Sequence, residues 1–333
     1  MLYANLVFSI LKLILGVAIF LFAIKIFSSS LKNHFGAKIK PLFEKVGNNR
    51  FAALGIGAGA TALMQSSTAT TVMTVGLVNV GVLTLFQSTA IIMGANVGTT
   101  LTSVLAAFSS LQIKYLLMSL SFIGFFIYIN FKDKKLLGSL FIGLGGIFIG
   151  LELLSLSFSN STILQGFFSG LFARVSFPLA LIALGAVFTA VIQSSSASTV
   201  IYMSMLANGL LSFNSAVFLI LGSEIGTCLT TLIASSKATT SAKRAAFVHL
   251  LFNLLSAIIF TAIMWPFGSI ITLWYTNLVT TAAWQLSIFQ VFYNVASVLI
   301  LIWFIKPLNK LVSFVIREKR VQTNLCKRNS LQL

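Results

Sequence analysis

The sequence predicts an all-α polytopic membrane protein built from two inverted-topology repeats. Three observations lead to this fold class. First, 58% of the 333 residues are hydrophobic and only 8% are charged, whereas a soluble domain carries about 25% charged residues. Second, several apolar stretches approach or exceed the roughly 20 residues that a helix needs to span a bilayer. Third, one polar motif occurs twice, at a spacing of 128 residues.

The apolar stretches alternate with connections that differ in charge. The clearest stretches are residues 5–27, 113–130, 136–157, 245–265 and 284–305. Lys and Arg cluster at residues 32–50, 132–135, 237–244 and in the tail 306–333. The charge-poor connections are residues 109–113, 156–177 and 266–283. Because basic residues concentrate in cytoplasmic loops, we expect a cell-membrane protein with its N-terminus outside and its C-terminus cytoplasmic.

The internal repeat is specific. Residues 61–102 align without gaps to residues 189–230, and the identical positions are mostly Gln, Ser, Thr and Gly. Chance similarity between apolar helices would favour Leu, Ile and Val instead. The flanking loops give the two copies opposite orientations in the membrane. Inverted repeats are typical of secondary transporters, whose substrate site lies near the midplane.

The repeats divide the chain into four expected parts. The first repeat covers residues 1–131, with a hairpin at about 51–80 and a broken helix at about 83–108. The second repeat covers residues 132–265, with a hairpin at about 178–207 and a broken helix at about 212–235. An extra transmembrane helix at 266–305 and a basic cytoplasmic tail at 306–333 follow.

A Gln-Ser-Ser turn lies inside each expected hairpin, between two apolar segments of about half a membrane span. A re-entrant hairpin fits this pattern, since polar backbone at the bilayer centre is tolerated only inside protein or along a cavity. Helix N-termini and neutral hydroxyl donors favour an anion. The expected substrate-binding residues are Gln65, Ser66, Ser67, Thr68, Gln193, Ser194, Ser195 and Ser196.

A second polar stretch follows each hairpin, at residues 94–100 and 222–228. Its glycines favour a break in the helix, with half-helix N-termini near Gly98 and Gly226. Carbonyls freed by such a break, together with hydroxyl oxygens, would suit Na⁺. Glu224 is the acid within these motifs, and intramembrane acids are costly and often functional. The expected cation-binding or coupling residues are Asn96, Thr99, Thr100, Glu224, Thr227, Thr71 and Thr199.

Several polar residues also have structural explanations. Ser, Thr and Gly in membrane helices often serve only close packing, although the duplication of the whole pattern favours a site. We expect Lys25 and Glu152, near helix ends, to extend to the membrane interface. We expect His249, beside a basic loop, to be solvated. No metal-ligand cluster and no catalytic Ser-His-Asp constellation is apparent in the sequence, which argues against an enzyme.

The paired QSS[ST] segments, each followed by a G-[AS]-[NE]-[VI]-G-T stretch, resemble the type II sodium–phosphate cotransporter family and its bacterial relatives. The resemblance covers about residues 5–265. It implies that Na⁺ drives the transport of inorganic phosphate across the membrane, by alternating access around the two Gln-Ser-Ser tips. Na⁺ is then the coupling ion, and no other cofactor is expected. The polar stretches of the family carry over here to Asn96, Thr99, Thr100, Glu224, Thr227 and Cys228.

Two positions depart from the family pattern. Thr68 replaces a third serine, and Glu224 replaces the usual asparagine, which could alter cation coupling. Many bacterial relatives also carry a C-terminal domain resembling the regulator PhoU, and this chain is expected to lack it.

Other functions stay open at this point. The same fold could move another small oxyanion such as sulfate or arsenate, act as an anion channel, or serve as a membrane scaffold. Export is as open as uptake. Nucleic acid is not an expected partner despite the net charge of +17, since the basic residues lie in loops and a tail without interleaved aromatic residues.

Overall fold

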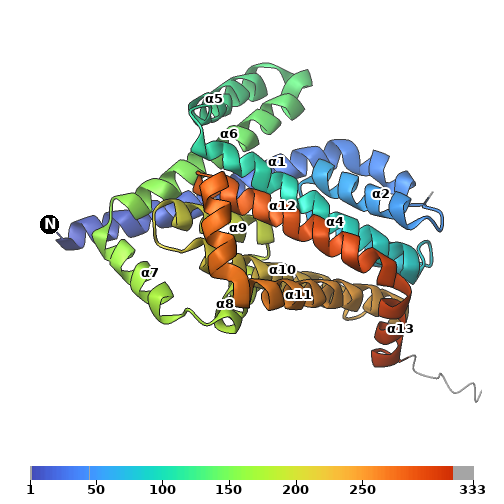
Figure 1. The fold of residues 1–333 in the computed structure, drawn as a ribbon. Helices are drawn as coiled ribbons and strands as arrows, with labels where there is room; N and C mark the ends of the chain where they lie inside the picture. The colour runs from blue at the N-terminus through green and yellow to red at the C-terminus, as the bar shows by residue number, and fades with distance from the viewer. Residues whose placement is uncertain (1, 45, 318–333) are drawn as a thin grey trace, which may run out of the picture.

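A computed structural model describes residues 2–44 and 46–317, and all regular secondary structure in these ranges is helical (Figure 1). This confirms the all-α membrane fold class. Six helical stretches are long and apolar enough to cross a membrane: Val7–Ile39, Leu85–Ser110, Lys132–Ser159, Phe213–Ser235, Thr240–Leu278 and Ala282–Val315. The part of the expected basic tail at 318–333 lies outside the described residues.

The helices of the N-terminal half are α1 (Leu2–Glu44), α2 (Arg50–Met64), α3 (Ser67–Asn79), α4 (Leu85–Ala107), α5 (Lys114–Asn130) and α6 (Lys135–Ser159). The helices that follow are α7 (Thr162–Arg174), α8 (Pro178–Ile192), α9 (Ser195–Ala207), α10 (Phe213–Ser235), α11 (Thr240–Leu278), α12 (Ala282–Leu301) and α13 (Ile305–Val315). Figure 1 shows α7 near the N-terminal end of α1 and α13 at the opposite end.

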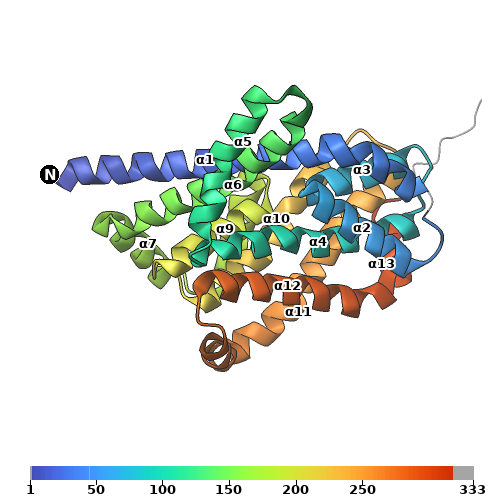
Figure 2. The same ribbon diagram turned by 90° about the horizontal axis from the view of Figure 1, so that it is seen from above.

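Helix α1 packs along α6 on one side of the bundle, and its N-terminal end projects beyond the other helices (Figure 2). Glycines of α6 let the two backbones approach closely. A Cβ atom on Gly150 would lie 2.6 Å from the backbone nitrogen of Phe20, and one on Gly143 would lie 2.7 Å from that of Phe27. Small residues therefore set the position of α1, as is common between membrane helices.

Three of the expected connections are partly helical. Helix α1 continues through residues 32–44, α7 lies within 156–177, and α11 continues through 266–278 despite Pro266. Apolarity was therefore a poor guide to helix length. Lys is a good helix former, so a basic segment that leaves the apolar region does not have to leave the helix.

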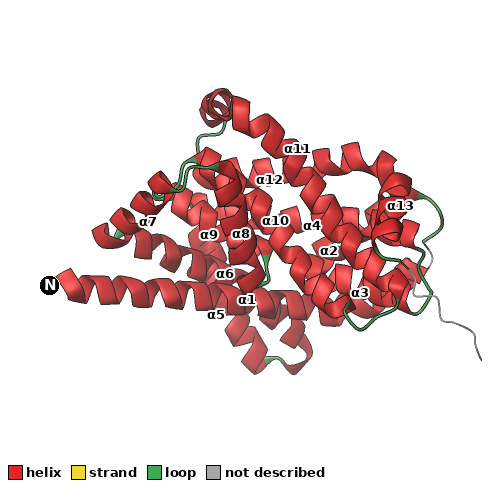
Figure 3. Ribbon diagram, turned by 90° about the horizontal axis from the view of Figure 1, so that it is seen from below, coloured by secondary structure: helices red, strands yellow, loops and turns green. Residues whose placement is uncertain are grey.

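The expectation of broken helices is wrong. Helices α4 and α10 run uninterrupted through residues 94–100 and 222–228 (Figure 3). Their glycines serve close packing instead. A Cβ atom on Gly94 would lie 2.0 Å from the carbonyl oxygen of Leu54, and one on Gly222 would lie 2.0 Å from that of Ile182. No half-helix begins at Gly98 or Gly226, so no helix N-terminus at these positions faces a substrate.

The same packing holds each Gln-Ser-Ser turn against a long helix. Helix α2 lies against α4 and α8 against α10, while α3 and α9 follow directly after the turns. Gly57 and Gly185, at equivalent positions of the repeat, approach the carbonyl oxygens of Ile91 and Leu219 in the same way. The domain boundaries, the inverted orientation and the re-entry of the hairpins into a membrane stay predictions.

Candidate functional site

Each Gln-Ser-Ser turn ends one helix and begins the next within two residues. Gln65 and Gln193 have left-handed backbone conformations, with φ of 50° and 60°, and cap the C-termini of α2 and α8. Ser66 and Ser194 are extended and cap the N-termini of α3 and α9. Positive φ is uncommon for residues other than glycine, and strained backbone of this kind clusters at functional sites.

Hydroxyl groups hold both turns in the same way. The backbone nitrogen of Ala69 donates to Ser66 Oγ over 3.1 Å, and that of Ala197 donates to Ser194 Oγ over 3.2 Å. Behind each turn, a second pair of hydroxyls joins the two helices. Thr61 Oγ1 donates to Thr70 Oγ1 over 2.9 Å, and Thr189 Oγ1 donates to Ser198 Oγ over 2.7 Å. The two turns are therefore built from equivalent contacts.

The two turns line one common pocket of about 510 Å³. Helix α1 and Thr102 of α4 complete its wall. The lining residues are Leu21, Ile24, Lys25, Ser28, Ser29, Gln65, Ser66, Ser67, Thr68, Thr102, Ile192, Gln193, Ser194, Ser195 and Ser196. The structure thus brings together all eight residues that the sequence predicts for substrate binding.

The chemistry of this pocket suits an anion. Helices α3 and α9 begin at it, and the first N–H groups of a helix have no partner within the helix. These groups carry the positive end of the helix dipole. Serine and threonine hydroxyls can donate further hydrogen bonds. Among the lining residues Lys25 carries a charge, and none of them is acidic.

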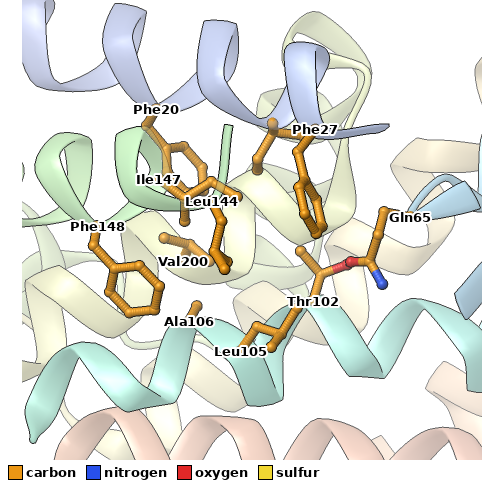
Figure 4. A pocket seen from close by; sticks show the side chains of 11 residues that line it. Phe20, Phe27, Gln65, Thr102, Leu105, Ala106, Leu144, Ile147, Phe148 and Val200 are labelled. Carbon is orange, nitrogen blue, oxygen red and sulfur yellow. The ribbon is translucent and has the colours of Figure 1, made fainter. Parts of the chain in front are cut away.

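Gln65 is oriented by a residue outside its own turn. Thr102 Oγ1 donates to Gln65 Oε1 over 2.9 Å, while Gln65 Nε2 donates to the Ala62 carbonyl over 2.7 Å. Figure 4 shows Gln65 beside Thr102, at the edge of a small void of about 10 Å³ whose wall includes Phe20 and Phe148. The alignment of the repeats places Thr102 opposite Thr230, so sequence identity had already marked this position.

The residues expected to bind a cation do not line the pocket. Asn96, Glu224 and all five of the threonines are buried within the bundle. The hydroxyls of Thr99, Thr100 and Thr227 donate to carbonyls of their own helices, over 3.0, 2.7 and 3.1 Å. Such bonds are typical of threonine within helices, and no freed carbonyl of a broken helix lies nearby.

Asn96 and Glu224, which are equivalent in the repeat, meet at a residue of α11. Asn96 Nδ2 donates to Asn253 Oδ1 over 2.6 Å. Asn253 Nδ2 in turn donates to the backbone carbonyl of Glu224 over 2.8 Å and to Cys228 Sγ over 3.1 Å. One buried amide therefore bridges α4 and α10.

The carboxylate of Glu224 is held by α12. Gln290 Nε2 donates to Glu224 Oε1 over 2.9 Å, and Gln290 Oε1 accepts a hydrogen bond from the hydroxyl of Ser103. Sequence reasoning missed Asn253 and Gln290. A signal was available, since each is a polar residue within a long apolar helix, outside the repeated motifs.

The remaining predicted residues lie apart from this cluster. Thr71 Oγ1 is 3.2 Å from Thr231 Oγ1, which is 3.3 Å from His249 Nδ1. His249 is fully buried, so the expectation that it is solvated is wrong: α11 is long enough to carry it into the bundle. Thr199 Oγ1 is buried with no hydrogen-bond partner among the described residues.

Comparison with protein families gives a match over most of the chain. The family described as Na+/Pi-cotransporter matches residues 19–156 and 169–274. The "Putative inorganic phosphate export protein YjbB" of Escherichia coli strain K12 is 30% identical over 222 residues, which are 66% of this chain and 40% of that protein. The "Uncharacterized protein YqeW" of Bacillus subtilis is 32% identical over 169 residues, which are 50% of this chain and 54% of that protein.

A shorter segment is similar to a mammalian protein. The "Sodium-dependent phosphate transport protein 2A" of Rattus norvegicus is 47% identical over 55 residues, which are 16% of this chain and 9% of that protein. The chain spans well under two thirds of the length of these relatives. No solved structure matches the chain.

Proposed function

Because the chain belongs to the Na+/Pi-cotransporter family, we propose that it moves inorganic phosphate across a membrane through the pocket between its two Gln-Ser-Ser turns. One observation carries this proposal. The eight residues of the two turns, 128 positions apart in sequence, line a single pocket whose lining residues include no acid. Phosphate is the anion that the family description names.

The donors around the pocket explain how phosphate could both bind and leave. The hydroxyls of Ser66, Ser67, Ser194 and Ser195 and the first N–H groups of α3 and α9 bind oxyanion oxygens as neutral donors. Neutral donors hold an anion less tightly than several fixed charges would. Alternating access then requires the elements that carry the two turns to move relative to each other, exposing the pocket to each side in turn.

Na⁺ coupling is a separate part of the proposal. The buried amides and carboxylate around Asn96, Asn253 and Glu224 offer oxygen atoms, which hard cations prefer. We place the coupling role at this cluster and not in the pocket, since Glu224 supplies a negative charge there. We also propose a cell-membrane location with a cytoplasmic C-terminus, which rests on the distribution of basic loops.

The test is radiolabelled phosphate flux in proteoliposomes, with and without a Na⁺ gradient. We expect Gln65→Ala and Gln193→Ala to abolish flux while the proteins still insert into the membrane. Ser169→Ala is the matched control, because among the described residues this exposed serine of α7 bonds only to carbonyls of its own helix. Normal flux in both glutamine variants would disprove the site. Flux that is indifferent to Na⁺ would disprove the coupling alone.

The same preparation separates the alternative functions. Excess unlabelled sulfate or arsenate that blocks flux better than phosphate would identify another oxyanion as the substrate. Electrical currents too large for a transport cycle would identify an anion channel. Export needs its own test, since the printed name of the Escherichia coli relative is that of an export protein. Loss of phosphate from preloaded cells that express the chain would support it.

A further inference from the structure

Lys25 lies on the wall of the pocket that the two Gln-Ser-Ser turns line. One face of α1 lines the pocket through Leu21, Ile24, Lys25, Ser28 and Ser29. These positions recur at intervals of three or four residues, which places them on one side of a helix. Lys25 is exposed, and part of its exposed surface therefore faces the pocket that the two turns line.

A hydrogen bond fixes this face of α1 next to the first turn. Ser28 Oγ donates to the carbonyl oxygen of Met64 over 2.7 Å, and Met64 is the last residue of α2 before Gln65. Lys25 lies three residues before Ser28, so its side chain starts one helical turn from this contact. Close packing of α1 on Gly143 and Gly150 of α6 holds the helix from its other side.

Lys25 takes no part in the ion pair that the described residues form. Lys114 Nζ lies 2.7 Å from Glu152 Oε2. This is the ion pair found among residues 2–44 and 46–317, and it does not include Lys25. Unlike the pseudo-symmetric turns, the positive charge is therefore present on one side of the pocket.

We propose that the ammonium group of Lys25 binds the transported anion directly and supplies the single full positive charge of the site. This inference rests on the proposed function and deepens it. The ammonium is a compact charge on a flexible stem, so it can follow an oxyanion within the pocket while the turns hold it with neutral donors. Hydrogen bonds between charged groups are about twice as strong as neutral ones, so Lys25 contributes more to affinity than any one serine.

The experiment compares phosphate flux of the purified full chain and its variants in proteoliposomes. We expect Lys25→Gln to raise the KM for phosphate about tenfold or more, the range expected for losing one charge-assisted hydrogen bond, with a smaller effect on kcat. Lys25→Arg should keep most of the affinity because it keeps the charge. Lys12→Gln is the matched control, since Lys12 lies on the same helix over the ring of Phe8 and does not line the pocket.

A second measurement separates loss of charge from damage to the fold. In Lys25→Cys, modification with a positively charged aminoethyl methanethiosulfonate should lower the KM for phosphate again, and a negatively charged sulfonatoethyl reagent should not. Equal effects of the two reagents, or a normal KM in Lys25→Gln, would overturn the role of Lys25 while leaving the proposed function intact. A wild-type protein that moves no phosphate overturns both.

Discussion

Gln290 donates a hydrogen bond to the carboxylate of Glu224 over 2.9 Å, and both side chains are buried between α10 and α12. Gln290 lies on α12, 66 positions from Glu224 along the chain, so a distant helix supports this acid. The amide of Asn253 ties the backbone of the same residue to Asn96. Because intramembrane acids often mark ion pathways, we look for cation coupling at this negative charge and its neutral partners.

Replacing Glu224 by glutamine should uncouple transport from Na⁺. The introduced amide would keep an oxygen that accepts from Gln290 Nε2, so the fold should survive, but the negative charge would be gone. We expect phosphate flux to lose its stimulation by a Na⁺ gradient while the KM for phosphate measured at saturating Na⁺ changes little. Flux with and without the gradient checks this, and an unchanged Na⁺ response would remove Glu224 from the coupling role.

Replacing Asn253 by leucine should destabilise the bundle. The change removes the donors to the Glu224 carbonyl and Cys228 and the acceptor for Asn96. Buried polar groups left without partners cost about 1–3 kcal/mol, so we expect a lower thermal unfolding temperature in detergent. Asn130→Ala is the control, because the amide of this exposed residue bonds only within α5 in the part of the chain that the structure describes. Equal melting temperatures would contradict the prediction.

Replacing each of two nearby glycines of α2 by alanine should change the stability of the protein in opposite directions. A Cβ atom on Gly57 would lie 2.0 Å from the carbonyl oxygen of Ile91, whereas one on Gly59 would meet nothing within 4 Å. Gly57→Ala must push α2 away from α4, at a cost of about 1–3 kcal/mol. Gly59→Ala should instead stabilise the helix by about 0.5–1 kcal/mol. Folded yield and thermal unfolding of both variants test the tight contact between the helices.

Thr102 should matter for phosphate affinity, and its repeat counterpart should not. Thr102→Val keeps the shape of the side chain but removes the donor to Gln65 Oε1. If losing this hydrogen bond weakens phosphate binding by about 1 kcal/mol, the KM for phosphate should rise roughly fivefold. The hydroxyl of Thr230 donates to the Thr227 carbonyl of its own helix, so Thr230→Val should leave the KM unchanged. Similar KM values in the two variants would show that the bond does not orient Gln65.

The two Gln-Ser-Ser turns that line the pocket could be identified from the sequence because they depend on local signals. Gln65 and Gln193 interrupt apolar segments, and serines that follow them can cap the next helix without any distant partner. The broken helices could not be judged in this way. A glycine in an apolar helix indicates either a break or a close approach of another helix. Gly94 and Gly222 lie against the carbonyl oxygens of Leu54 and Ile182, so these glycines serve close approach.

Composition and short motifs were enough to predict the helical membrane class, the duplicated Gln-Ser-Ser turns and the family of the chain. They act through local backbone preferences and through the requirement for apolar surface. The packing of the helices was needed to show that α1 brings Lys25 to the wall of the pocket, and that Asn253 and Gln290 hydrogen-bond to Glu224 of α10. Asn253 and Gln290 lie 29 and 66 positions from Glu224 along the chain. Such contacts depend on which helix faces pack together, and hydrophobic periodicity alone does not specify the partner of a polar side chain within an apolar helix.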